Sequence, residues 1–167
     1  MAKLQGKTVG ESQTETVEVV LPNDANPLGN LLGGKVMHLI DIAGAISAQR
    51  HSRSQVVTVA VDHLDFICPI RVGEHVALRA HMTRAFRTSM EVEVRVYRED
   101  YMTGKRQQTS SAFVTYVALD PLGKPQEIPP LIVSTKEEKR RFREALRRRR
   151  QRLHLAAQAH RRYFEKS

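Results

Sequence analysis

The chain has 167 residues, 41% of them hydrophobic and 27% charged, with no tryptophan and one cysteine. This length suits one domain with a sizeable core and a short appendage. No run approaches the roughly 18 consecutive apolar residues of a membrane span, and residues 1–10 lack the apolar core of a signal peptide. The single Cys68 can form neither an internal disulfide nor a zinc cluster, so we expect a reducing, cytoplasmic setting.

The net charge of +9 raises the question of nucleic-acid binding, so the position of this charge matters. Residues 1–133 contain 14 basic and 14 acidic residues, whereas residues 134–167 contain 13 basic and four acidic ones. The whole excess therefore lies in a C-terminal tail, residues 134–167. We expect it to be separate from a body formed by residues 1–133.

The residue pattern predicts a strand, a loop, a helix and then four or more strands. Apolar and polar residues alternate over 14–21, and a loop rich in proline, asparagine and glycine follows. Over 35–49 apolar residues recur every three or four positions, and the opposite side is also largely apolar, so we expect this helix to be buried on nearly all sides. Further strands are expected at 56–66, 75–83, 90–98 and 112–119.

The segment 90–98 shows the clearest strand alternation. Its valines fall on one face, and Glu91, Glu93 and Arg95 fall on the other. A strand, a buried helix and a run of antiparallel strands form an α+β layout. An antiparallel sheet wrapped around one long buried helix satisfies this layout.

The tail has the pattern of a basic amphipathic helix. Ser134 with Glu137, or Thr135 with Glu138, offers a capping box at its start. Among the arginines, a seam recurs at intervals of three, four or seven: Phe142, Leu146, Leu153, Ala157, His160 and Phe164. We expect this seam to pack on the body or on a neighbouring subunit.

Asp41 is the unexpected residue in the predicted central helix. Charged side chains are seldom fully buried without a partner or a task. Either a neighbouring hydroxyl or backbone group satisfies the carboxylate, or its burial makes it a better base or nucleophile.

Gly33 and Gly34 directly precede this helix. They could form a simple tight turn, or they could leave N–H groups at the positive end of the helix open to the oxyanion of a tetrahedral intermediate. Asp41 lies roughly 12 Å beyond Gly33 at about 1.5 Å per residue. A carbonyl bound at the helix start is then out of reach of the same chain's Asp41, so the spacing predicts a site shared between two subunits.

Asn26 lies in the loop before the two glycines. It could cap a turn through its own side chain, or it could orient an attacking water or bind a carbonyl oxygen; Asn30 is a weaker candidate. The sequence contains no G-x-S-x-G, H-E-x-x-H, P-loop or G-x-G-x-x-G motif. The scattered histidines, such as His38 and His51, are not expected to be metal ligands.

The chain resembles the hotdog-fold acyl-CoA thioesterases, specifically the cytosolic acyl-CoA hydrolases. The resemblance covers about residues 12–132 and rests on the order and spacing of four segments: LPNDANPLGNLLGGKVMHLIDIAGAISAQRH (21–51), VVTVAVDHLDFICPIRVGE (56–74), TSMEVEV (88–94) and SAFVTYVALDPLGKPQEIPPL (111–131). One departure is Leu31-Leu32, where relatives often have a smaller or polar residue. The tail is also longer than the family core requires.

This resemblance implies hydrolysis of fatty acyl-CoA to free fatty acid and CoA, with no metal or redox cofactor. It places Asp41 and Asn26 in one site across a dimer interface, beside the amides of Gly33-Gly34. It also implies CoA contacts at Arg87, Thr88 and Ser89. Homodimers, often joined into hexamers as trimers of dimers, are the expected assembly.

Two other functions are considered. A related hydratase or dehydratase would pair an acid with a histidine as D-x-x-x-x-H, and no aspartate here has a histidine five residues on. A protein of another class would bind acyl-CoA as a sensor, without hydrolysis, and use the tail for nucleic-acid or membrane contact. For the tail itself, attraction to CoA phosphates, acidic lipid or nucleic acid is the alternative to packing.

Overall fold

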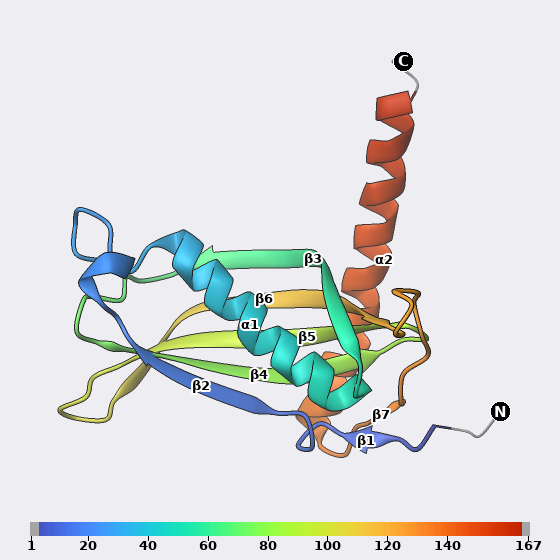
Figure 1. The fold of residues 1–167 in the computed structure, drawn as a ribbon, viewed down its shortest axis with the longest axis horizontal. Coiled ribbons are helices and arrows are strands. Elements are labelled where there is room, and N and C mark those ends of the chain that lie inside the picture. The colour runs from blue at the N-terminus through green and yellow to red at the C-terminus, as the bar shows by residue number, and fades with distance from the viewer. Residues whose placement is uncertain (1–3, 165–167) are drawn as a thin grey trace.

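The computed structural model describes residues 4–164, and side chains as far as Gln158. A five-stranded sheet curves around helix α1, while helix α2 crosses the opposite face and extends past strand β3 (Figure 1). The elements in chain order are β1 (Lys7–Thr8), β2 (Thr14–Val19), a 3-10 turn (Pro22–Asp24), α1 (Gly33–Ser52), β3 (Gln55–Phe66), β4 (His75–Ala85), β5 (Ser89–Glu99), β6 (Arg106–Leu119), β7 (Leu131–Ile132) and α2 (Lys136–Phe164). The predicted α+β architecture is confirmed.

The sheet has the strand order β2-β4-β5-β6-β3, and all neighbouring strands are antiparallel. Strand β3 is therefore an edge, although it is joined directly to α1. The predicted helix and strands are all present, with β6 longer at its start than expected. The short parallel pair β1–β7 was not predicted, because two-residue strands leave no periodic pattern.

The expectation that α1 is buried on nearly all sides is wrong for the single chain. Val36, Leu39 and Ile40 lie in the core, but Met37 and Ile42 are 50% and 42% exposed. The sheet wraps around only one side of the helix, so the other apolar side faces outward. The edge strand β3 is exposed as well, through Val57, Val59 and Val61.

Tyr116 fixes the height of α1 above the sheet. This fully buried residue of β6 donates a hydrogen bond from its hydroxyl to the backbone oxygen of Asp41, at 2.9 Å. A Cβ on Gly44 would lie 3.1 Å from Tyr116 Cζ and closer still to the hydroxyl, so only glycine fits there. Burial raises the pKa of Tyr116, which keeps the phenol protonated.

Helix α2 begins at one of the two predicted capping boxes. Thr135 Oγ1 accepts a hydrogen bond from the Glu138 N–H, and Glu138 Oε2 accepts one from the Thr135 N–H, at 3.1 and 3.0 Å. Neither helix of the described chain is long and apolar enough to cross a membrane.

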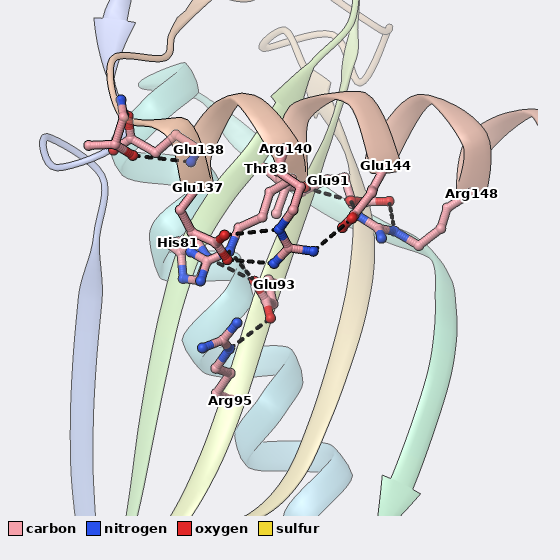
Figure 2. A network of polar contacts seen from close by, with 12 residues as sticks. His81, Thr83, Glu91, Glu93, Arg95, Glu137, Glu138, Arg140, Glu144 and Arg148 are labelled. Carbon is pink, nitrogen blue, oxygen red and sulfur yellow. Dashed lines mark hydrogen bonds and ion pairs between the residues drawn. The ribbon is translucent and has the colours of Figure 1, made fainter.

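The face of the sheet opposite α1 is charged and is covered by α2. The alternation predicted for β5 is confirmed, yet Glu91 and Glu93 are only 0% and 5% exposed. Arg148 of α2 donates two hydrogen bonds to Glu91, at 2.7 and 3.1 Å, and Thr83 donates a third at 2.5 Å (Figure 2). The tail therefore packs on the body largely through ion pairs.

The apolar seam of the tail contributes only at its beginning. Phe142 packs against the core and Ala145 is fully buried, whereas Leu153 is 54% exposed. The side chains of His160 and Phe164 lie outside the described residues. Arg152 pairs with Asp62 on β3, and residues 153–158 beyond it are exposed.

Candidate active site

The start of α1 offers backbone N–H groups that no side chain caps. The helix begins at Gly33, its N-cap Leu32 makes no side-chain hydrogen bond, and the first amide bonded back into the helix is that of Val36. A Cβ on Gly34 would have nothing within 4 Å, so the space above this residue is open. Free amides at the positive end of a 20-residue helix suit an anionic oxygen.

Asn26 caps a turn in the loop before the helix through its own side chain, which is one of the two roles considered from the sequence. Its Oδ1 accepts hydrogen bonds from the Leu28 and Asn30 amides, at 3.0 and 3.1 Å. This turn fixes the orientation of the side chain, because Oδ1 is occupied and Nδ2 makes no hydrogen bond within the described chain. Asn26 thus keeps a donor for a further oxygen atom.

Asn26 and Gly33 line the same pocket, which has a volume of about 290 Å³. Its walls come from the loop, the first turn of α1, the end of β3, the segment that follows it and the start of β6. The lining residues are Asn26, Asn30, Leu31, Gly33, Val36, Phe66, Ile67, Cys68, Pro69, Ile70, Thr109 and Ser110.

Asp41 lies in a different pocket, together with Gly34. It is exposed in the single chain, contrary to the expectation of burial, because it belongs to the outward side of α1. Thr58 of β3 donates a hydrogen bond to Asp41 Oδ1 at 2.5 Å. The pocket, about 370 Å³, is lined by Gly34, Met37, His38, Ile40, Asp41, Thr58, Val61, Leu64 and Val114.

Thr58 was missed by sequence reasoning. Its only signal is one hydroxyl among the valines of residues 56–61. A hydroxyl that donates to one carboxylate oxygen restrains the side chain and leaves the other oxygen for chemistry.

The proposed catalytic residues therefore fall into two pockets that share the start of α1. Asn26 and Gly33 line one of them, and Gly34 and Asp41 line the other. One chain does not gather all four residues into a single pocket.

The predicted CoA contacts Arg87, Thr88 and Ser89 lie at the turn between β4 and β5 and line neither pocket. Ser89 pairs with Val117 of β6, whereas Phe66, next to Gly33, pairs with Ser110. Seven residues of strand separate these positions, roughly 23 Å at about 3.3 Å per residue. The hairpin is thus at the opposite end of the sheet from the helix start.

The two histidines named from the sequence lie within α1. His38 is exposed in the pocket of Asp41, whereas His51 is fully buried and its Nε2 lies 2.8 Å from the Pro129 oxygen. Burial lowers the pKa of His51, which favours the neutral ring. Within residues 4–158 no group of three His, Cys, Asp or Glu side chains could hold a metal ion.

Comparisons with known proteins agree with this fold. The family model described as "Thioesterase superfamily" matches residues 28–105. The uncharacterized acyl-CoA thioester hydrolase YkhA of Bacillus subtilis is 41% identical over 77% of this chain and 74% of its own length. The cytosolic acyl coenzyme A thioester hydrolase of the mouse is 38% identical over 82% of this chain, which spans only 36% of that protein.

Solved structures are similar over almost the whole chain. The acyl-CoA hydrolase of Bacillus cereus superposes with a TM-score of 0.87 at 37% identity, over 93% of this chain and 94% of that one. The acyl-CoA hydrolase of Staphylococcus aureus, solved with butyryl-CoA and CoA, gives 0.86 at 32% identity, over 95% and 98%. That enzyme has also been solved with one aspartate, one asparagine or one threonine replaced by alanine.

Proposed function

The chain belongs to the acyl-CoA thioester hydrolases of the thioesterase superfamily, an enzyme family with the hotdog fold, and we propose that it hydrolyses fatty acyl-CoA to free fatty acid and CoA. The proposal rests mainly on one observation: an oriented carboxylate and the uncapped backbone amides of a helix start line the same pocket. Asp41, held by Thr58, lines the same pocket as Gly34 at the start of α1.

In the proposed reaction the thioester carbonyl oxygen binds the N–H groups near Gly34. The dipole of α1 stabilises the negative charge that develops when the carbonyl carbon is attacked. Asp41 either takes a proton from the attacking water or attacks the carbonyl itself to give an anhydride that water then opens. Either route consumes one water and releases the thiol, so no cofactor is required.

The reacting groups are proposed to come from two subunits. Each chain separates Asn26 from Asp41, and the side of α1 that carries Asp41 is continuous with an exposed apolar edge strand. A second copy that covers this side would bury Met37, Ile42 and the β3 valines. It would also bring its own loop asparagine, with the free Nδ2 donor, toward this chain's Asp41.

The Staphylococcus aureus variants support the choice of residues. The asparagine, aspartate and threonine replaced in that enzyme are 15 and 17 residues apart along its chain. Asn26, Asp41 and Thr58 have the same separations. We propose that these three residues act together, and that Arg87, Thr88 and Ser89 contact CoA from another subunit.

The assembly is proposed to be a hexamer built from dimers. Three similar structures, one at 41% identity with a TM-score of 0.88, are described as hexameric thioesterases. The body, residues 1–133, would hold the catalytic groups, and the tail would support it. The name of the mouse relative supports a cytoplasmic location.

The test is release of free thiol from acyl-CoA substrates of short, medium and long chain length. Asp41→Ala should bind acyl-CoA but lower kcat about 10³-fold, as expected for loss of a general base. Glu18→Gln, which alters an exposed carboxylate of β2, is the control. Undiminished kcat in the Asp41 variant would refute its role, and no thiol release by the unmodified chain would favour the sensor.

A mixture of two inactive variants tests the shared site. If Asn26 and Asp41 act across the interface, subunits carrying Asn26→Ala and Asp41→Ala form mixed dimers with one intact site. An equal mixture should then recover about a quarter of the normal activity. No recovery, with exchange of subunits verified by mass spectrometry, would place both residues in one chain.

A single-turnover experiment in ¹⁸O-labelled water separates the two proposed routes. The appearance of ¹⁸O in the Asp41 carboxylate would support direct attack by Asp41 over base catalysis.

A further inference from the structure

The arginines of α2 divide into two groups by their partners. Arg141, Arg148 and Arg152 face the sheet, near Glu93, Glu91 and Asp62, and Arg140 pairs with two glutamates of its own helix. Four further arginines of α2 whose side chains the structure describes have no described carboxylate oxygen within 4.0 Å: Arg143, Arg147, Arg149 and Arg150.

Arg149, one of these arginines, shares an aromatic neighbour with Arg84 of the sheet. The Arg84 guanidinium of β4 lies 3.9 Å from the Phe142 ring centre and 5.4 Å from that of Phe86, and the Arg149 guanidinium lies 4.4 Å from Phe86. Arg84 donates to the backbone oxygen of Phe142 at 2.9 Å, and its buried Nε makes no hydrogen bond in the described chain. Glu91 lies opposite it on β5, but that carboxylate pairs with Arg148.

The guanidinium charges of the cluster repel one another. Burial lowers the pKa of Arg84, and the nearby charges of Arg149 and Arg150 lower it further, while the carboxylate of Glu91 raises it in part. The aromatic faces offset only part of this repulsion. A doubly charged anion would neutralise the guanidinium groups and accept their hydrogen bonds.

We propose that Arg84 and Arg149, which both approach the Phe86 ring, form a binding site for a phosphate group together with Arg150, the next residue on α2. Arg84 supplies a positive charge from the sheet beneath α2. Arg149 and Arg150 supply the more accessible N–H donors from α2 itself. Phe86 holds the Arg149 guanidinium in place and links the cluster to the hairpin that carries Arg87.

The phosphate could belong to the nucleotide end of CoA or to a free phosphate compound. The adjoining hairpin, Arg87 to Ser89, is the segment proposed to contact CoA, and the CoA source rests on that proposed function. The phosphate site itself does not require hydrolysis. Direct binding measurements therefore separate failure of this site from failure of the enzyme assignment.

The experiment compares two double variants of the full-length chain that lose the same charge. Arg149→Gln with Arg150→Gln removes the accessible donors, whereas Arg143→Gln with Arg147→Gln alters exposed arginines outside the cluster. Binding of inorganic pyrophosphate and of CoA is measured by calorimetry, with competition between the two. We expect the first variant to raise the Kd about tenfold and the control to change it less than about twofold.

Competition between CoA and pyrophosphate would identify the source as CoA, and KM for acyl-CoA should then rise with no rise for an acyl-pantetheine substrate that lacks phosphate. Pyrophosphate binding that depends on Arg149 and Arg150 but is not displaced by CoA would support the site with a separate ligand. Equal losses in both variants, or no dependence on either pair, would overturn the proposal. Arg84→Lys, which keeps a charge but loses the planar donors, provides an independent variant should either double variant fold poorly.

Discussion

The two faces of the sheet are built from the same strands but are buried in different ways. The inner face places the valines of β4, β5 and β6 against α1, and hydrophobic packing excludes water there. The outer face buries carboxylates such as Glu91 and Glu93, and basic side chains of α2 and of the sheet itself neutralise them. Alternation along a strand thus predicts which residues share a face, but not whether a charged face is exposed.

The inner face is also incomplete, whereas the carboxylates of the outer face are neutralised within the chain. Around α1 an apolar side with Asp41 remains open, and the proposed chemistry is located there. On the outer face, each carboxylate described has a cation from α2 or from the sheet. The exposed apolar side of α1 is where a second subunit is needed, whereas the face of the sheet covered by α2 contributes to the stability of the single chain.

The largest expected effect on stability comes from removing one member of a buried ion pair. Glu91→Ala leaves Arg148 without its carboxylate beneath α2, so the free energy of unfolding should fall by about 3–5 kcal/mol. Urea unfolding monitored by circular dichroism measures the change. Arg140→Ala, which breaks exposed pairs on the same helix, should cost no more than about 1 kcal/mol. Similar losses in the two variants would contradict the distinction between buried and exposed pairs.

A comparable effect is expected from acid. Burial alone would raise the pKa of Glu93, but hydrogen bonds from His81 and Arg95 lower it from 4.5 to about 2. Since the folded chain then binds this proton less readily than the unfolded chain, the stabilisation is complete above pH 4.5 and is lost as the pH falls toward 2. The contribution is up to about 3 kcal/mol.

Thermal unfolding between pH 2 and pH 6 tests this contribution of the outer face. Glu93→Gln should be less stable at pH 6, and it should lose less stability on acidification than the unmodified chain. Parallel curves for the two proteins would show that Glu93 does not carry the acid sensitivity.

A smaller effect is expected at the inner face. Gly44→Ala would push a methyl group into the Tyr116 ring and should cost about 1–3 kcal/mol through overpacking. Adding Tyr116→Phe removes the hydroxyl that the methyl group meets first, so part of the loss should be recovered in the double variant. A double-mutant cycle measures this recovery, and additive losses would mean that the two residues do not compete for space.

Much of the fold could be predicted from the sequence because it depends on local pattern. The central helix, the strands of the sheet and the capping box at Thr135 and Glu138 each follow from neighbours along the chain. The open side of α1 could not be predicted, because an apolar surface does not show whether the same chain or another covers it. The burial of Glu91 depends on Arg148, 57 residues away, and only the fold brings the two together.

The residues of the candidate site differ in how clearly the sequence singles them out. Asp41, Gly33 and Gly34 stand out as a charge in an apolar helix and as an uncapped helix start. Thr58 does not stand out, since its contact with Asp41 depends on how the exposed edge strand aligns with α1. The spacing argument for a shared site agrees with the separation of Asn26 and Asp41 into two pockets.

The pairing of α2 with buried carboxylates has a consequence for local opening of the structure. When α2 detaches from the sheet, Glu91 loses Arg148 and Glu93 loses Arg141, and both carboxylates become hydrated. The inner core on the other face of the sheet does not depend on these ion pairs. Detachment of α2 is thus a partial unfolding event that water and charge drive, and it can occur while the apolar core stays closed.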